Sequence, residues 1–158
     1  MPMPTRGWST TAIGKWHLTP RDQRAEGPFH MWPTGVGFDR YYGFLNGETS
    51  QWTPNLVRDQ THVEPPSTPD QGYHLDKDLA DEAIAQLREL RLTNSKRPWL
   101  LWYATAAPHA PHQAPPEWLD MHAGRFDGGW DKWREDRLAA QIELGIAPPD
   151  TQLSLIHI

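Results

Sequence analysis

Three side chains in this sequence can hold an anion or move a proton. Lys15 and His17 stand two residues apart in the apolar run "GKWHL", and His109 stands in a proline-rich segment, residues 107–116. A lysine ammonium neutralises negative charge, and a histidine can exchange a proton near pH 7. Residues two apart in extended backbone project to the same side. We therefore predict that these three side chains line one pocket for a compact oxyanion such as sulfate or phosphate.

Each of these motifs also has a plainer interpretation. A Lys-x-His pair occurs by chance in many chains, and a histidine in a proline-rich loop is more often a turn residue. His109 and His112 have the spacing of a metal pair, but a proline-rich loop lacks helical geometry and no third ligand stands out, so we predict no metal site here. Aromatic side chains in the long loop either shape a substrate site or pack the loop, and we favour packing. They are Tyr41, Tyr42 and Trp52.

The elements that must position these residues form a strand, helix and strand pattern. Residues 9–16 are β-branched and then apolar, which favours a short buried strand. Residues 76–92 carry an apolar stripe at helical spacing, with acidic first turns and basic last turns. That stripe is Leu79, Ala83, Ile84, Leu87 and Leu90. Residues 98–104 are apolar without alternation, which is typical of a strand covered on both faces in a parallel sheet. Ligands of such sheets bind beyond the carboxyl ends of the strands, where His17 and His109 both fall.

The remaining segments are an ordered loop region and two further helices. Residues 19–70 are dense in Gly, Pro, Asn and aromatics, which predicts loops with brief strands. The proline pair at 115–116 can start a short helix that runs through Met121. A second amphipathic helix is predicted from Asp127, with Gly145 as its C-terminal stop. Its expected inward side chains are Trp130, Trp133, Leu138, Ile142 and Leu144.

Composition limits the functional classes. The 158 residues suit one domain or a piece of one. Fifteen Lys and Arg against twenty Asp and Glu give a charge of −5, and no segment gathers cations, so we expect no nucleic-acid partner. No apolar stretch is long enough to span a membrane, so we expect no membrane partner. The absence of cysteine excludes disulfides and a thiol nucleophile within these residues, and leaves the cellular compartment open.

Five segments in order resemble one enzyme family. They are "TTAIGKWHL", "GFDRYYGFLNGETSQWTPNLVRD", "GYHLDKDLADEAIAQL", "AAPHAPHQAPPEW" and "GRFDGGWDKWREDRLAAQIELGIAPPD". Together they look like the central part of a bacterial arylsulfatase, with Gly-Lys-Trp-His as a family signature. The resemblance implies an α/β fold of the alkaline-phosphatase-like class, with a mixed, mostly parallel sheet flanked by helices. It also implies hydrolysis of a small-molecule sulfate ester; a phosphonate or phosphodiester hydrolase of the same superfamily is the alternative.

The resemblance also implies a role for each candidate residue. Lys15 matches the lysine that contacts the formylglycine nucleophile and a sulfate oxygen. His17 matches the histidine that takes a proton from the formylglycine hydrate and so assists release of sulfate. His109 matches the histidine beside the ester oxygen, which contacts sulfate and is a candidate proton donor to the leaving group. His112 falls where the family often has leucine, so we expect it to be a pocket wall.

Parts of the family pattern are missing from this chain. The Cys/Ser-x-Pro-x-Arg motif that becomes formylglycine is absent; residues 2–6 resemble only its end, with proline in place of the nucleophile. The aspartates and the Asp-Asn pair that hold Ca²⁺, and a second lysine, are absent too. We therefore expect residues 1–152 to be a partial catalytic domain, truncated at both ends and inactive alone, with anion binding as its remaining property. Residues 153–158 match a translated library-preparation adapter, so we expect a non-native tail; a short terminal strand is the alternative.

Overall fold

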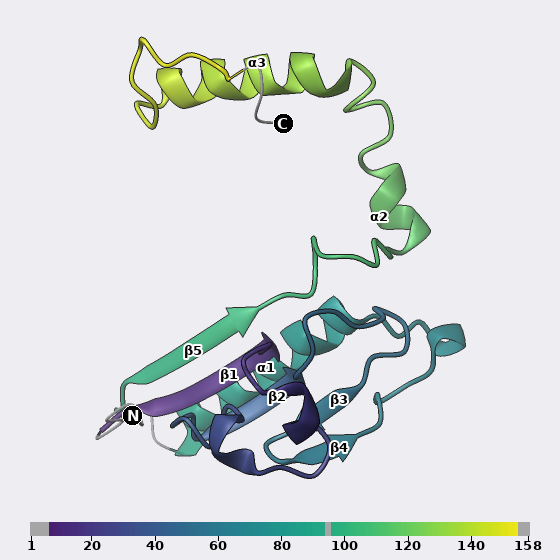
Figure 1. Cartoon of the computed structure of the whole chain (residues 1–158), viewed down its shortest axis with the longest axis vertical. Coiled ribbons are helices and arrows are strands. Elements are labelled where there is room, and N and C mark those ends of the chain that lie inside the picture. Colours follow the sequence, from purple (N-terminus) through teal and green to yellow (C-terminus); the bar gives the residue numbers. More distant parts are fainter. Residues whose placement is uncertain (1–6, 94–95, 155–158) are drawn as a thin grey trace. The chain divides into compact units, whose positions relative to one another are not determined.

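The fold comes from a computed structural model that describes residues 7–93 and 96–154. It divides into two compact units, Met1–Ala114 and Pro115–Ile158. The first unit contains the sheet and one long helix, and the second contains two helices (Figure 1). The strands are β1 (Ser9–Lys15), β2 (Arg40–Phe44), β3 (Leu56–Arg58), β4 (Thr61–Val63) and β5 (Trp99–Ala104). The α-helices are α1 (Leu75–Thr93), α2 (Pro116–Asp120) and α3 (Gly129–Glu143), and three short 3₁₀ turns lie at Arg21–Gln23, Phe29–Met31 and Pro69–Gln71.

The five strands form one mixed sheet in the order β4-β3-β2-β1-β5. Strand β1 runs parallel to β2 and to β5, with Ala12 opposite both Tyr41 and Trp102. Strands β3 and β4 continue the sheet in antiparallel pairs. Because β1 and β5 are parallel neighbours, the chain must cross between them, and α1 lies in that crossover. The predicted α/β class and the strand, helix and strand pattern are thus confirmed.

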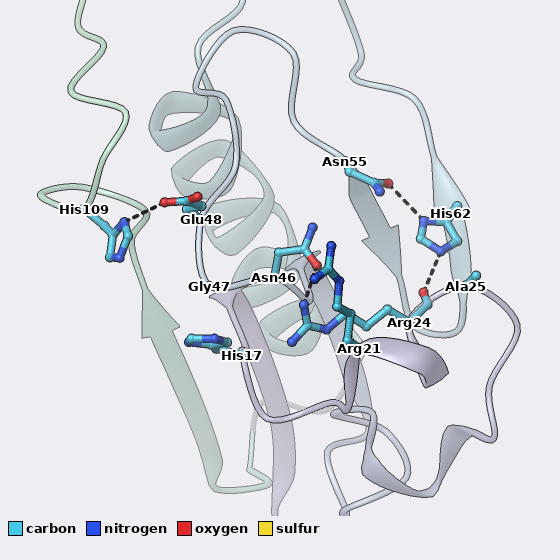
Figure 2. Close-up of a pocket in the computed structure, with 10 residues that line it drawn as sticks. All are labelled: His17, Arg21, Arg24, Ala25, Asn46, Gly47, Glu48, Asn55, His62 and His109. Carbon is cyan, nitrogen blue, oxygen red and sulfur yellow. Dashed lines mark hydrogen bonds and ion pairs between the residues drawn. The ribbon is translucent and has the colours of Figure 1, made fainter.

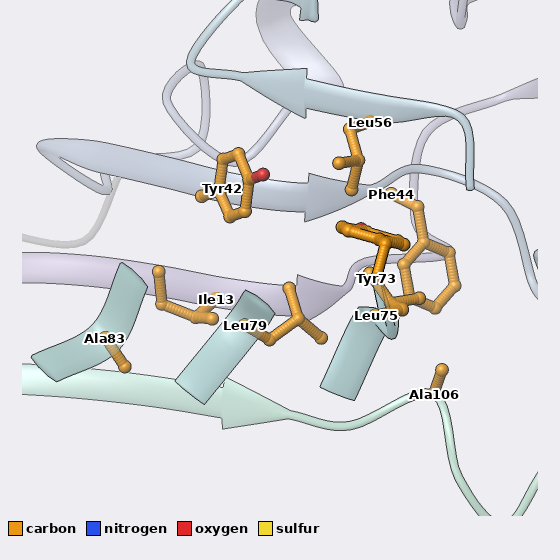
Figure 3. Packing of buried hydrophobic residues seen from close by; sticks show 9 residues of the cluster. All are labelled: Ile13, Tyr42, Phe44, Leu56, Tyr73, Leu75, Leu79, Ala83 and Ala106. Atoms are coloured by element: carbon orange, nitrogen blue, oxygen red, sulfur yellow. The ribbon is translucent and has the colours of Figure 1, made fainter. Parts of the chain in front are cut away.

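Both faces of the central strands are buried. On one face, Ile13 of β1 and Phe44 of β2 pack against Leu79 of α1 (Figure 3). On the other face, the loop between β1 and β2 covers the sheet with Trp32 and Phe38. The predicted loop region therefore serves as a second covering layer, and the carboxyl ends of β1 and β2 are held firmly from both sides.

Helix α1 is confirmed within one residue at each end, but the stripe it buries differs in part. Leu79 and Ala83 are buried as predicted, whereas Ile84 is 46% exposed and Gln86 is buried. The buried positions follow each other at intervals of four and three residues, so Ile84 lies beside the stripe rather than on it.

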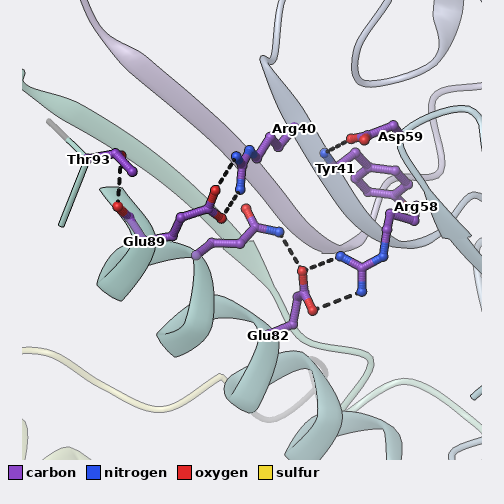
Figure 4. Close-up of polar contacts among 8 residues, drawn as sticks. Arg40, Tyr41, Arg58, Asp59, Glu82, Glu89 and Thr93 are labelled. Atoms are coloured by element: carbon purple, nitrogen blue, oxygen red, sulfur yellow. Dashed lines mark hydrogen bonds and ion pairs between the residues drawn. The ribbon is translucent and has the colours of Figure 1, made fainter. Parts of the chain in front are cut away.

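Two arginine–carboxylate pairs join α1 to the sheet (Figure 4). Arg40 of β2 donates both terminal N–H groups to Glu89, at 2.6 and 2.9 Å. Arg58 of β3 does the same to Glu82, at 2.5 and 2.9 Å. Bidentate pairs are directional, so they fix how the helix lies along the strands as well as holding it.

Strand β5 is present as predicted, but the expected cover on both of its faces is not. Within the described residues it pairs only with β1 and forms an edge of the sheet. Trp99 and Trp102 are about half exposed, at 51% and 54%. A continuous apolar run shows that both faces of a strand are apolar, but it does not say that the same stretch of chain supplies the cover.

The second unit confirms two helices but not the predicted burial. Helix α3 has no buried residue, and Trp130 on its expected inner face is 75% exposed. Gly145 adopts a left-handed φ of 70° just after the helix, as predicted for its C-terminal stop. Leu153 and Ser154 are not in a strand, and the rest of the expected tail lies outside the described residues. None of the described helices is long and apolar enough to cross a membrane.

Candidate anion-binding site

A pocket of about 850 Å³ lies in the first unit, at the carboxyl ends of the parallel strands (Figure 2). Its lining residues are His17, Arg21, Arg24, Ala25, Asn46, Gly47, Glu48, Asn55, His62 and His109. Their order across the pocket follows the sheet: His109 comes after β5, His17 after β1, and residues 46–48 after β2. Asn55 directly precedes β3 and His62 lies within β4. The pocket therefore extends along the sheet rather than lying at a single strand.

The backbone at the end of β1 and just after it sets the position of His17. Gly14 has a left-handed φ of 97°, and a Cβ there would lie 1.9 Å from the carbonyl oxygen of Ala104. Only glycine allows this close approach of β1 to β5. The next anchor is Trp16, whose indole N–H donates to the carbonyl of Met31 at 2.9 Å.

The extended backbone predicted through His17 is not observed. Strand β1 ends at Lys15, and His17 has a left-handed φ of 59°. Histidine tolerates this region better than most side chains do. Its imidazole packs on Gly47, where an added Cβ would lie 2.6 Å from Cε1 of the ring. His17 therefore faces the pocket because the chain turns, and not because it alternates with Lys15.

Lys15 lies at the edge of this arrangement. It is the half-buried last residue of β1, paired with Phe44 in the register with β2. Its amine makes no hydrogen bond or ion pair with any residue that the structure describes, and Lys15 is not among the lining residues of the pocket. The structure thus brings His17 and His109 to one pocket and leaves Lys15 at the adjoining strand end.

His109 lies on a loop that is fastened on both sides. Before it, the N–H of Ala106 donates to Asp76 of α1 at 3.3 Å. After it, the side-chain carbonyl of Gln113 accepts the backbone N–H of Gln51 at 2.8 Å. Between these anchors the His109 side chain is half exposed. The loop is therefore held in place while its histidine stays accessible.

The hydrogen bonds of His109 define its tautomer. Its Nδ1 lies 2.9 Å from the carbonyl oxygen of Ala110 and 3.7 Å from a carboxylate oxygen of Glu48. A carbonyl oxygen can only accept a hydrogen bond, so Nδ1 carries the hydrogen. This leaves Nε2 as the ring nitrogen that can exchange a proton with a ligand.

The part of the pocket farther from His109 contains residues that the sequence analysis did not identify. Arg24 donates from Nε to the carbonyl of Thr19 and from Nη1 to Asn46, each at 2.9 Å. The Arg24 carbonyl in turn accepts from Nε2 of His62 at 3.0 Å. Arg21 lines the pocket beside them (Figure 2). These residues come from turns, loops and the short strand β4, none of which shows a periodic pattern, so only the folded chain brings them together.

The other candidates from the sequence lie away from the pocket. His112, expected as a pocket wall, is exposed and is not a lining residue. Tyr41 and Tyr42 are buried on opposite faces of the sheet, and the Trp52 ring packs edge-on against His74 at 5.0 Å. The packing interpretation of these aromatics agrees with the structure. Among the described residues, no three His, Cys, Asp or Glu side chains are placed to hold a metal ion.

Comparison with known protein families shows which family this chain belongs to. The family model described as Sulfatase matches residues 3–153, nearly the whole chain. The chain belongs to the sulfatase family. This sulfatase chain is 29% identical to the arylsulfatase of Klebsiella aerogenes over 96% of its own length and 32% of the relative's length. It is also 30% identical to the uncharacterized sulfatase YdeN of Escherichia coli, over 78% of this chain and 23% of that one.

Solved structures agree with the fold. The crystal structure of Ps i-CgsB in complex with k-i-k-neocarrahexaose superposes with a TM-score of 0.59 at 27% identity. The match covers 74% of the present chain and 28% of that one. A second crystal structure of Ps i-CgsB gives a TM-score of 0.58 at 25% identity. The sulfatase chain described here therefore spans about a third or less of the length of these relatives.

Proposed function

We propose that this chain forms the sulfate-holding part of an enzyme that hydrolyses sulfate esters of alcohols or phenols. The observation that carries the proposal is the position of His17 and His109, which follow two adjacent parallel strands and line one pocket. Lys15 ends the first of these strands. Membership of the sulfatase family supports a sulfate ester as the substrate of the whole protein.

Each of the three side chains then has the role that the family resemblance implies and that its chemistry allows. The Lys15 ammonium neutralises charge on the sulfate oxygens with up to three N–H donors. His17 accepts a proton when the sulfate is released. His109 donates a proton to the leaving oxygen from Nε2 of the doubly protonated ring, because its Nδ1–H is held by the Ala110 carbonyl.

Two components of the proposed reaction belong to the rest of the protein. A formylglycine, made from a Cys or Ser outside this chain, would supply the nucleophile that attacks sulfur. Calcium, implied by the family resemblance, would need ligands from elsewhere, because the described residues provide no set of three suitable side chains. The DNA sequence upstream of the chain tests the first point: a Cys/Ser-x-Pro-x-Arg codon run supports it, and an open reading frame without one contradicts it.

The anion-binding role can be tested on the 158-residue chain itself. A ligand that binds only the folded state raises the free energy of unfolding, so sulfate should raise the thermal unfolding midpoint. Lys15→Ala and His109→Ala should remove this rise. Arg88→Gln, which removes a charge from the exposed face of α1, should keep it. An unfolding midpoint of the unmodified chain that does not respond to sulfate contradicts the role.

The reaction can be tested on the whole protein. Lys15→Ala or His109→Ala should lower turnover of an aryl sulfate by about 10²–10³-fold or more, with an unchanged fold by circular dichroism. Parallel rates on sulfate and phosphate esters separate the sulfatase from the phosphonate or phosphodiester hydrolase alternative. Faster turnover of the phosphate esters would overturn the proposed reaction while keeping the anion site.

A further inference from the structure

The pocket is much larger than a sulfate group. Its volume of about 850 Å³ lies within the range of sites that hold a drug-sized molecule, roughly 300–1,000 Å³. Between the His17 end and the His62 end it follows β1, β2, β3 and β4. Three strand spacings of about 4.8 Å give a length of about 14 Å. The leaving group of a bound ester therefore has room to extend along the sheet, away from His109.

The lining of this extension is polar and cationic. Arg21 and Arg24 contribute two permanent positive charges, and neither forms an ion pair with any carboxylate that the structure describes. The carboxylate among the ten lining residues, Glu48, lies at the opposite end beside His109, 3.7 Å from its Nδ1. None of the ten described residues that line the pocket is Phe, Tyr or Trp. An uncharged aromatic leaving group would find no aromatic side chain to stack on among these residues.

Arg24 is held ready for a ligand. Two of its five N–H bonds go to Thr19 and Asn46, which fix the guanidinium beside the end of β2. The other three N–H bonds have no partner among the described residues. The His62 ring holds the Arg24 carbonyl in turn: its Nε2 donates to that carbonyl at 3.0 Å, and its Nδ1 lies 3.1 Å from Oδ1 of Asn55. A guanidinium held in this way is suited to bidentate binding of a planar or tetrahedral anion.

We infer that Arg21 and Arg24 bind a second anionic group of the substrate, so that the substrate is a saccharide with two or more sulfate or carboxylate groups. This inference rests on the proposed function, because the first sulfate is the one held near Lys15, His17 and His109. Since the Arg24 guanidinium is hydrogen-bonded to Asn46, just after the strand next to β1, the second anion binds about 5–10 Å from the first. A singly charged aryl sulfate fills only the catalytic end of the pocket.

Two commercially available sugars that differ in one anionic group provide the test. Glucosamine N,6-disulfate and N-acetylglucosamine 6-sulfate are titrated into the 158-residue chain, with calorimetry or NMR as the measure of affinity. The chain should bind the disulfate at least about ten-fold more tightly, as expected for one added charge-assisted contact. Arg21→Gln should remove most of that preference and leave the affinity for the monosulfate unchanged.

A conservative substitution suits Arg24, because its side chain also holds the loop after β1 through hydrogen bonds to Thr19 and Asn46. Arg24→Lys keeps the positive charge but removes the planar guanidinium that can donate two parallel hydrogen bonds. It should lower the preference for the disulfate several-fold. Arg88→Gln on the exposed face of α1 is the matched control and should change neither affinity. Unfolding midpoints check that each variant is folded.

The outcomes separate this inference from the proposed function. Equal affinity for the two sugars, or a preference that survives both arginine variants, overturns the second anion site and leaves the sulfate site standing. Failure of the unmodified chain to bind either sugar overturns both.

Discussion

Replacing Gly47 with alanine should move the His17 imidazole without damaging the fold. The Cβ of Gly47→Ala would lie 2.6 Å from Cε1 and 2.7 Å from Nε2 of His17. Ordinary contact between such atoms begins at about 3.4 Å, so the ring must retreat by about 0.8 Å. The atoms it meets are the far end of a flexible side chain, and the backbone of Gly47 does not have a left-handed φ. The strain can therefore be relieved by moving the histidine alone.

The two expected effects have opposite signs. Gly to Ala at a compatible backbone position stabilises by about 0.4–1 kcal/mol, because it restricts the unfolded chain. A displaced His17 loses its hydrogen bond to a bound anion, which is worth about 1.5–3 kcal/mol when charge-assisted. Sulfate should then bind about 10- to 150-fold more weakly to a protein that is as stable as before or slightly more stable.

The assay measures both quantities on the same variant. Urea unfolding gives the free energy of unfolding, and a sulfate titration followed by the imidazole ¹⁵N resonances of His17 gives the affinity and the position of the ring. Gly128→Ala is the matched control, since its φ is −69° and its added Cβ would meet only the flexible chain of Lys132 at 3.2 Å. It should leave sulfate binding unchanged.

Two results would refute the reasoning about Gly47. Unchanged sulfate affinity and unchanged His17 resonances in Gly47→Ala would show that this contact does not set the position of the ring. A loss of more than about 1 kcal/mol in the free energy of unfolding would show that the backbone there, and not only the histidine, needs glycine.

Further predictions concern the framework that holds the pocket. Leu79→Ala should lower the free energy of unfolding by about 3 kcal/mol, because Leu79 is fully buried between α1 and the sheet. Trp102→Ala should lower the free energy of unfolding by less than about 1 kcal/mol, since Trp102 is 54% exposed. Urea unfolding measures both variants, and an equal loss in Leu79→Ala and Trp102→Ala would contradict the view of β5 as an open edge of the sheet. Partial burial acts to raise the pKa of Glu82, but hydrogen bonds from Arg58 and Gln86 outweigh it and lower that pKa from its ordinary 4.5. The Glu82 carboxylate therefore stabilises the fold above pH 4.5 and loses this effect as the pH falls through the lowered pKa. Glu82→Gln should lower the free energy of unfolding by about 1 kcal/mol at pH 7, an effect that disappears as the pH falls through the lowered pKa, and a difference that stays constant with pH would contradict the assignment.

The sequence predicted those parts of the fold in which one local signal dominates. The apolar stripe and the charge gradient of residues 76–92 predicted both ends of α1 to within one residue, because both signals repeat along the helix. The β-branched run before Gly14 and the apolar run after Pro98 gave β1 and β5, and their parallel pairing confirmed the expected sheet. The placement of His17 and His109 beyond two strand ends followed from that topology alone.

The sequence could not predict features that depend on what covers an element or on one dihedral angle. The exposure of Trp102 and Trp130 depends on neighbours that a periodic pattern does not specify. The left-handed turn at His17 reverses the expected relation to Lys15, because alternation holds only while the backbone stays extended. Arg24 and His62 meet through a backbone carbonyl between residues 38 positions apart, and no spacing rule signals such a contact.

The turn at His17 also explains why the site is shaped before any ligand binds. A left-handed residue other than glycine persists only where its surroundings determine it. Here Gly14 presses β1 against β5, Trp16 is hydrogen-bonded to Met31, and the imidazole fits against Gly47. None of these contacts involves an anion, so the direction of His17 comes from the fold. A ligand entering the pocket meets a histidine that is already in place, and binding need not spend free energy on ordering it.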